Sequence, residues 1–173
     1  DVYSDDKQTH WDVNYKAVSD LVDLCNENNV RLVHISSDFV YSNSIENASE
    51  SDVPVHNENW YGYTKLLGDA HVQLKSVDYL LIRTSYKPKP FPYDKAWTSQ
   101  KGNFDYVDNI AAIIIKLIDN DLRGVYNVGT ELKTMYDLAA RTKKTVQPSD
   151  RLHHSTMPVN VTMDLGKLMS EEL

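Results

Sequence analysis

The sequence predicts an α/β protein, in which a doubly wound parallel sheet is followed by a small C-terminal lobe. Segments with a helical spacing of apolar residues alternate along the chain with short apolar runs, and turn residues bound these runs. The chain has 173 residues, of which 41% are hydrophobic, and this is enough to form a core. Alternating helices and buried strands are typical of a parallel sheet covered on its faces by helices.

The first predicted unit is a helix over residues 11–28 and a strand over residues 30–35. One helical stripe of apolar or small residues consists of Val13, Ala17, Leu21 and Leu24. Two asparagines, Asn28 and Asn29, end the helix. The run after them is rich in β-branched residues, so we expect a strand that is buried on both faces.

The second unit repeats this order after a long polar loop. Residues 42–58 carry Ser, Asn and Glu and predict the loop. Residues 61–74 return to a helical pattern, and residues 79–82 form a second buried run. We therefore place residues 1–83 in the sheet-forming core.

The pattern changes after Arg83. Three prolines alternate with lysines and aromatic residues over residues 86–95, which predicts an irregular basic loop on the surface. Regular patterns then resume as helices over residues 105–120 and 134–144, and as short strands over residues 125–128 and 159–163. We assign residues 84–173 to this loop, a returning helix and a small α/β lobe.

Composition excludes several classes of protein. A formal charge of −7 argues against nucleic acid or an anionic membrane as the main partner. The longest apolar stretch, residues 110–118, contains Lys116 and is too short to cross a bilayer. Cys25 is the only cysteine, so an internal disulfide and a cysteine-rich metal site are both excluded. We expect a cytoplasmic protein without a metal site.

The candidate chemistry lies around the first predicted strand. Ser36, Ser37 and Asp38 follow its carboxyl end, where open α/β sheets place their ligand crevice. Tyr61 and Lys65, at positions i and i+4 of the next helix, stand on one face. An ammonium group beside a phenol favours the phenolate, so we expect a lowered pKa for Tyr61 and an acid/base role.

The Tyr-x-x-x-Lys spacing alone is a weak signal, because roughly one such pair is expected by chance in a chain of this composition. Tyr3 and Lys7 have the same spacing. No predicted strand precedes them, and we interpret them as part of a solvated loop. The serines at the strand end are what distinguish Tyr61 and Lys65.

These residues carry a family resemblance. The segments 35–41, Ile-Ser-Ser-Asp-Phe-Val-Tyr, and 61–66, Tyr-Gly-Tyr-Thr-Lys-Leu, resemble the extended short-chain dehydrogenase/reductases, especially the dTDP-4-dehydrorhamnose reductase-like branch. The resemblance implies a Rossmann-like fold. It also implies that Ser37 hydrogen-bonds a substrate oxygen, Tyr61 donates or accepts the proton, and Lys65 holds the nicotinamide ribose while tuning the tyrosine.

The resemblance extends along the whole chain. Residues 11–17 resemble the family helix with a Val-Asn pair, which implies that Asn14 helps to order the catalytic lysine. Residues 83–85 resemble the strand end before the substrate loop, and Arg83 is assigned to the cofactor site. Further similar segments are residues 104–111, 124–129 and 163–168.

One departure from the family is large. The glycine-rich dinucleotide loop, Gly-x-x-Gly-x-x-Gly, is not found, because none of the six glycines of the chain form that spacing. Either the sequence belongs to a longer enzyme whose opening βαβ units precede residue 1, or the protein has lost its cofactor site. We favour the longer enzyme.

The resemblance therefore predicts an NAD- or NADP-dependent enzyme that acts on a nucleoside-diphosphate sugar. A homodimer is a further expectation. Substrate contacts are assigned to Ser37, Asp38, Lys87, Lys89 and Lys95, because the lysines can meet a diphosphate. Among the reactions of this family we favour reduction. Family dehydratases carry Asp-Glu or Glu-Glu beside the strand-end hydroxyl, whereas Phe39 follows Asp38 here.

Three alternatives stay open. The enzyme can be an epimerase or dehydratase of the same family, or the chain can be a non-catalytic binding subunit that keeps the fold. A metal hydrolase that uses His153 and His154 is the weakest, because adjacent histidines point in different directions and no carboxylate stands at a ligand spacing.

Overall fold

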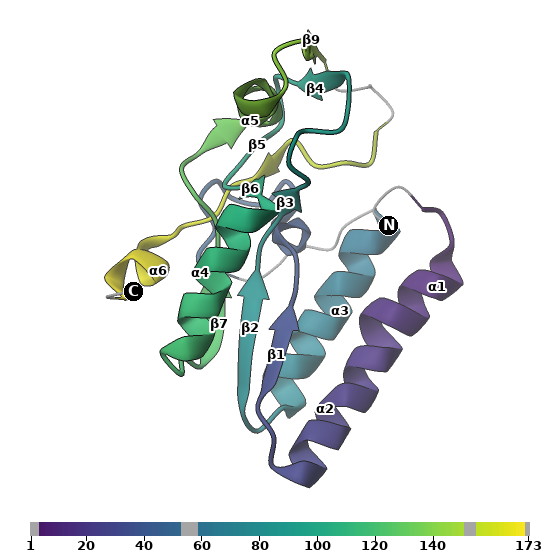
Figure 1. Cartoon of the computed structure of the whole chain (residues 1–173). Coiled ribbons are helices and arrows are strands. Elements are labelled where there is room, and N and C mark those ends of the chain that lie inside the picture. The colour runs from purple at the N-terminus through teal and green to yellow at the C-terminus, as the bar shows by residue number, and fades with distance from the viewer. Residues whose placement is uncertain (1–3, 53–58, 151–154, 172–173) are drawn as a thin grey trace.

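The computed structural model describes residues 4–52, 59–150 and 155–171. Its helices, shown in Figure 1, are α1 (Lys7–Trp11), α2 (Ala17–Asn28), α3 (Trp60–Lys75), α4 (Val107–Asp119), α5 (Met135–Thr142) and α6 (Gly166–Ser170). Its strands are β1 (Leu32–Ile35), β2 (Tyr79–Arg83), β3 (Tyr86–Lys87), β4 (Lys95–Trp97), β5 (Lys101–Gly102), β6 (Asp105–Tyr106), β7 (Gly124–Asn127), β8 (Lys133–Thr134), β9 (Gln147–Ser149) and β10 (Asn160–Val161).

The core is a parallel three-stranded sheet with the order β1-β2-β7. Side chains alternate along β2, so Leu80 and Ile82 pack with Ile110 of α4, whereas Leu81 packs on the opposite face with Val22 of α2. Helices therefore cover both faces of the sheet (Figure 1), and the predicted α/β class is confirmed.

Strand β1 differs from the prediction of a strand buried on both faces. Of its residues only Leu32 is buried, while Ile35 is 38% exposed, and Val30 lies outside the strand and is 56% exposed. Within the described residues β1 pairs with β2 alone and forms one edge of the sheet. An apolar run indicates burial only where neighbouring elements cover it, and here one side of β1 has no neighbour.

The helix predicted over residues 11–28 begins earlier, at Lys7, where the Asp6 side chain accepts a hydrogen bond from the Thr9 backbone. A π-helical segment, Asp12–Lys16, separates α1 from α2. It packs against α3 at a glycine, because a Cβ on Gly68 would lie 2.3 Å from the Asn14 carbonyl oxygen. The glycine thus permits a backbone approach that a larger residue would block.

The second lobe stands over the carboxyl ends of β1 and β2 (Figure 1). It contains α5, the pair β4-β9 and the small sheet β10-β5-β8. The segment predicted as a surface loop after Arg83 contributes to its core, since Phe91 and Ala96 are buried against Leu138 and Ala139. Aromatic residues between the prolines form this core, although prolines exclude long regular elements there.

The two parts do not separate at one point in the sequence. Helix α4 and strand β7 follow residue 83, yet β7 pairs with β2 and α4 covers the core sheet. The chain leaves the core after β2, builds part of the lobe, and returns through α4 and β7. The lobe is therefore joined to the core sheet by more than one segment of the chain.

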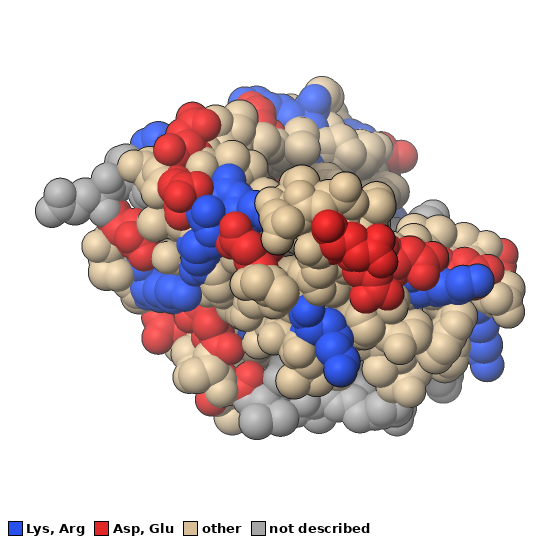
Figure 2. All heavy atoms as spheres, turned by 90° about the horizontal axis from the view of Figure 1, so that it is seen from below, with Lys and Arg blue, Asp and Glu red and all other residues tan. Residues whose placement is uncertain are grey.

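The end of the molecule opposite the lobe carries interspersed acidic and basic side chains (Figure 2), and no broad basic patch is visible on that face. None of the helices in the described ranges is long and apolar enough to span a bilayer. Among the same residues, no group of three or more potential ligands could hold a metal ion. His153, His154 and Tyr3 lie outside the described residues.

Candidate active site

A hollow of about 340 Å³ opens at the carboxyl ends of β1 and β2, below the lobe. We call it the strand-end hollow. Its walls include Ile35, Ser37, Tyr61, Lys65, Thr84, Tyr86 and Lys87. The structure therefore brings together Ser37, Tyr61 and Lys65, the three residues that sequence analysis grouped as catalytic candidates.

Helix α3 positions Tyr61 and Lys65. The Asn59 side chain caps this helix by accepting a hydrogen bond from the Gly62 backbone at 3.1 Å. Tyr61 and Lys65 follow in the first turns, four residues apart, and both face the strand-end hollow. The ring of Tyr61 is held edge-on by Phe39, with 5.6 Å between the ring centroids.

Ser37 begins the 3₁₀ turn Asp38–Tyr41, and its Oγ accepts a hydrogen bond from the Phe39 backbone at 3.1 Å. Burial raises the pKa of the Tyr61 phenol above its ordinary value, and a hydrogen bond with the Ser37 side chain opposes this effect. The nearby Asp38 carboxyl also raises it. The predicted lowering of the Tyr61 pKa by Lys65 is therefore wrong for this structure.

The Lys65 ammonium explains why. Its Nζ donates a hydrogen bond to the Ile35 carbonyl oxygen at 2.7 Å. Burial lowers the pKa of Lys65 to about 8, while Asp69, one turn further along α3, opposes the change. With its ammonium directed at the strand end, Lys65 is not among the groups that shift the tyrosine.

Asn14 contacts the neighbourhood of the lysine rather than the lysine itself. Its amide nitrogen donates to the Thr64 hydroxyl at 3.1 Å and lies 3.4 Å from Nδ1 of His10. His10 in turn meets the edge of the Tyr61 ring at 6.0 Å between centroids. Asn14 thus joins the π-helical segment to α3 beside Lys65, and its predicted role in ordering the lysine stays a prediction.

Asp38 and Arg83 are not part of the lining of the strand-end hollow. Asp38 is only 1% exposed and lines a small inner cavity behind Ser37. Arg83 is buried, and its guanidinium binds both carboxylate oxygens of Asp69 at 2.8 and 2.9 Å. Their positions do not support the predicted contacts of Asp38 with substrate or of Arg83 with a cofactor.

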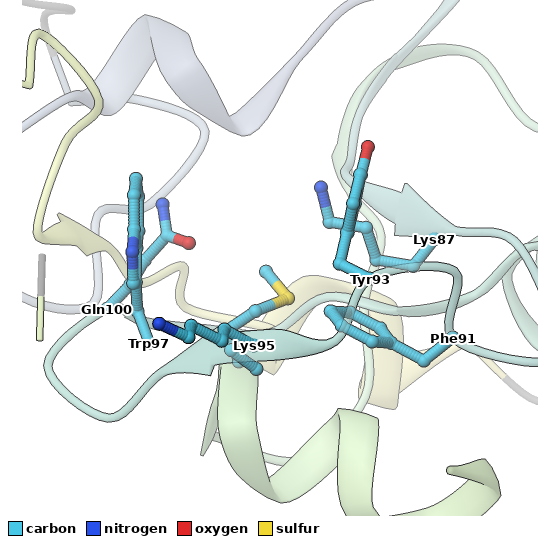
Figure 3. Close-up of a pocket in the computed structure, with 8 residues that line it drawn as sticks. Lys87, Phe91, Tyr93, Lys95, Trp97 and Gln100 are labelled. Carbon is cyan, nitrogen blue, oxygen red and sulfur yellow. The ribbon is translucent and has the colours of Figure 1, made fainter. Parts of the chain in front are cut away.

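A second hollow of about 230 Å³ lies in the lobe, and we call it the aromatic hollow. In Figure 3 the rings of Trp97 and Tyr93 stand on opposite sides of it, with Phe91 and Lys95 along its floor. Lys87 lines both hollows and so marks where they adjoin.

The three lysines predicted to meet a diphosphate are therefore not equivalent. Lys87 and Lys95 line the aromatic hollow. Lys89 is not in its lining, and its Nζ forms a half-exposed ion pair with Asp108 at 2.8 Å. Although Lys89 is only two residues after Lys87 in the sequence, its side chain lies on a different surface.

Sequence reasoning missed several residues of the two hollows. Thr84 and Tyr86 line the strand-end hollow, and the Thr84 hydroxyl is buried without a hydrogen-bond partner among the described residues. Trp97 and Tyr93 were not assigned a role. The aromatic residues among the prolines of residues 86–97 were a usable signal, because apolar rings are rarely placed on a purely solvated loop.

Comparison with known proteins places the fold. Residues 1–87, half of the chain, match a family described as RmlD substrate binding domain. A hypothetical dTDP-4-dehydrorhamnose reductase from Sulfolobus tokodaii is 23% identical, with a TM-score of 0.80 over 95% of this chain and 67% of that chain. A search of curated proteins gave no match.

Two further solved structures have the same fold. The dTDP-4-dehydrorhamnose reductase of Bacillus anthracis str. Ames, in complex with NADP, is 21% identical, with a TM-score of 0.78 over 95% of this chain and 66% of that chain. The UDP-glucuronic acid 4-epimerase of Bacillus cereus, in complex with NAD, is 18% identical, with a TM-score of 0.71 over 97% of this chain and 61% of that chain. The chain spans about two thirds or less of the length of these structures.

Proposed function

This chain belongs to the RmlD substrate binding domain family, and from that premise we propose that it forms the catalytic and substrate-binding part of an NAD(P)-dependent reductase of nucleoside-diphosphate sugars. The observation that carries the proposal is the meeting of Ser37, Tyr61 and Lys65 in one hollow at the carboxyl ends of parallel strands. A hydroxyl, a phenol and an ammonium group together can bind and protonate a carbonyl oxygen.

The raised pKa of Tyr61 fits the proton donor that a reduction requires. A phenol whose pKa lies above its ordinary value is protonated at neutral pH, so it can give a proton to the oxygen of a keto sugar. The Ser37 hydroxyl, hydrogen-bonded to Tyr61, can hold the same substrate oxygen. The cofactor would supply the hydride that completes the reduction.

Residues of the strand-end hollow fit the nicotinamide end of such a cofactor. The Lys65 ammonium and the Tyr61 phenol suit ribose hydroxyls. The Thr84 hydroxyl, which has no hydrogen-bond partner among the described residues, is a further polar group for such a contact. Arg83, which is paired with Asp69, is left out of this site. Of the similar structures, the Bacillus anthracis reductase was solved with NADP and the Bacillus cereus epimerase with NAD, so the proposal covers both.

The substrate would lie across the two hollows. We assign the sugar to the strand-end hollow, beside Ser37 and Tyr61. Flat walls formed by Trp97 and Tyr93 suit stacking against a nucleobase, which contributes about 1–3 kcal/mol per base. Lys87 and Lys95 supply positive charge for a diphosphate between the two ends.

A first prediction tests this assignment on the 173-residue chain. Calorimetric titration with dTDP or UDP is expected to detect binding. The double variant Lys87→Ala, Lys95→Ala is expected to bind the nucleotide at least about 10-fold more weakly, because two charge-assisted contacts are lost. Lys89→Ala is the matched control and should bind like the parent. Equal binding by the double variant and the parent at low and moderate salt would remove the lysines from the site.

A second prediction tests the proposed reaction. A pyrophosphate is normally held by a glycine-rich turn and a helix N-terminus, and this sequence has no such glycine pattern. We expect no measurable NAD(P)H binding by the 173 residues alone. A polypeptide extended by the preceding coding sequence is expected to bind NAD(P)H and to oxidise it in the presence of a nucleoside-diphosphate 4-keto sugar. Micromolar cofactor binding by the 173 residues would contradict the first expectation.

Product analysis separates the alternatives. A reductase consumes one NAD(P)H for each sugar, an epimerase leaves the cofactor unchanged at the end of the cycle, and a dehydratase releases water. A non-catalytic subunit would bind the sugar nucleotide and give no product. A cytoplasmic location and a homodimer stay predictions from the sequence.

A further inference from the structure

Asp38 is the buried ionisable group that the proposed reaction leaves without a role. Its side chain is 1% exposed, and its Oδ1 accepts a hydrogen bond from the Ser37 hydroxyl at 3.3 Å. Its Oδ2 has no hydrogen-bond partner within the described ranges. Because one of the two carboxylate oxygens is buried without a partner there, a negative charge on Asp38 is poorly compensated and the neutral acid is favoured.

The surroundings of Asp38 support the neutral form near neutral pH. Burial raises the pKa of Asp38 to about 7, although Lys87 on β3, the hydrogen bond from Ser37 and backbone hydrogen bonds from Phe39 and Asp38 oppose the change. Tyr61 on α3 is the other titratable group that interacts with it. The remaining walls of its cavity, which include Trp97, Gln100 and Met157, carry no charge.

Ser37 connects Asp38 with Tyr61. Its Oγ donates to the Asp38 carboxyl at 3.3 Å. It also lines the strand-end hollow with Tyr61, and its interaction with the phenol lowers the pKa of Tyr61. The Phe39 backbone N–H fixes the same oxygen at 3.1 Å. A hydroxyl held between a phenol and a carboxyl can accept a proton from one and donate a proton to the other.

We propose that Asp38 stores the proton that restores Tyr61 after each reduction, and that the Ser37 hydroxyl passes it on. The proposal rests on the proposed reductase function. Asp38 acts through Ser37 and does not touch the substrate, so it is an auxiliary residue that positions and supplies the proton.

The steps balance as follows in the direction of reduction. The bound cofactor would supply the hydride of the new C–H bond, and the O–H bond of Tyr61 breaks as its proton joins the carbonyl oxygen. The Tyr61 oxygen then takes the proton of the Ser37 hydroxyl, and Ser37 takes the proton of the Asp38 carboxyl. Asp38 is left as a carboxylate near Lys87 and regains one proton from solvent. The sugar gains one hydride and one proton in total.

The ionisation of Asp38 can be measured without cofactor by the pH dependence of unfolding of the 173-residue chain. A carboxyl whose pKa is raised in the folded state stabilises it less as the pH rises from about 4 through 7, because the unfolded chain ionises more readily. Asp38→Asn removes the ionisable carboxyl and with it this pH dependence of stability. The melting temperature of the variant relative to the parent should rise between pH 5 and pH 7.5, whereas the difference for the exposed control Asp23→Asn should stay constant. A constant difference for Asp38→Asn would overturn the proposal.

The relay itself is tested in the complete enzyme by the pH profile of kcat. Asp38→Asn is expected to lower kcat at least about 10-fold at neutral pH, with KM for the sugar nucleotide unchanged, and to remove the ionisation near pH 7 from the profile. A merely structural role would change kcat without removing that ionisation. An inactive parent would overturn the proposed reductase and the relay with it, whereas an active parent and an Asp38→Asn variant with the same kcat and the same profile would overturn the relay alone.

Discussion

Turnover of the complete enzyme is expected to fall by about 100-fold or more when Tyr61 is replaced by Phe, with little change in binding of the sugar nucleotide. The substitution removes the hydroxyl that donates the proton and keeps the ring, which packs against Phe39 and His10. Steady-state rates of NAD(P)H oxidation measure the first quantity, and calorimetric titration measures the second.

Tyr63→Phe is the control for this experiment. Tyr63 lies on the same helix but is not part of the lining of the strand-end hollow, so its variant should retain near-parental turnover. Near-parental turnover in Tyr61→Phe itself would rule out Tyr61 as the acid/base group. A similar melting temperature for both variants would show that a loss of rate does not arise from unfolding.

The largest loss of stability is expected from Asp69→Ala. The Asp69 carboxylate is fully buried, binds the Arg83 guanidinium through two contacts, and accepts a hydrogen bond from Ser36 at 2.8 Å. Its removal leaves the buried Arg83 guanidinium without a carboxylate to balance its charge, which typically costs about 3–5 kcal/mol of the free energy of unfolding. Urea unfolding of the 173-residue chain measures this quantity.

The exposed ion pair between Lys89 and Asp108 provides the comparison. Both side chains are about half exposed, so Asp108→Ala is expected to cost no more than about 1 kcal/mol. A double replacement, Asp69→Leu with Arg83→Met, should recover much of the loss, because an apolar pair does not strand a buried charge. Equal losses for Asp69→Ala and Asp108→Ala would show that burial does not control the strength of these pairs.

The Asp69 pair also organises the strand-end hollow. Through Ser36 it holds the turn that carries Ser37, and through Arg83 it holds the end of β2 just before Thr84. Asp69 favours the charged form of Lys65, one turn earlier on α3. The pair is therefore a link between α3 and both strand ends of the candidate site.

The local pattern of the sequence determined the helices and the central strand of the core. The helix predicted over residues 61–74 is α3, and the strand over residues 79–82 is β2, each within one or two residues. Apolar spacing of 3.6 or 2 residues reports such elements directly, because each periodicity belongs to one backbone conformation. The i and i+4 spacing likewise placed Tyr61 and Lys65 on one face, and the resemblance to a known family joined Ser37 to them.

Tertiary structure decided what the groups of the site experience. The direction in which the pKa of Tyr61 shifts depends on burial and on Ser37 and Asp38. The ion pair of Arg83 depends on Asp69, which lies on a different element. Separation of Lys89 from Lys87 and Lys95 depends on how the lobe folds around Phe91. Sequence periodicity reports only the local backbone and the face of each element, whereas desolvation and ion pairing depend on the groups that the fold brings near from distant parts of the chain.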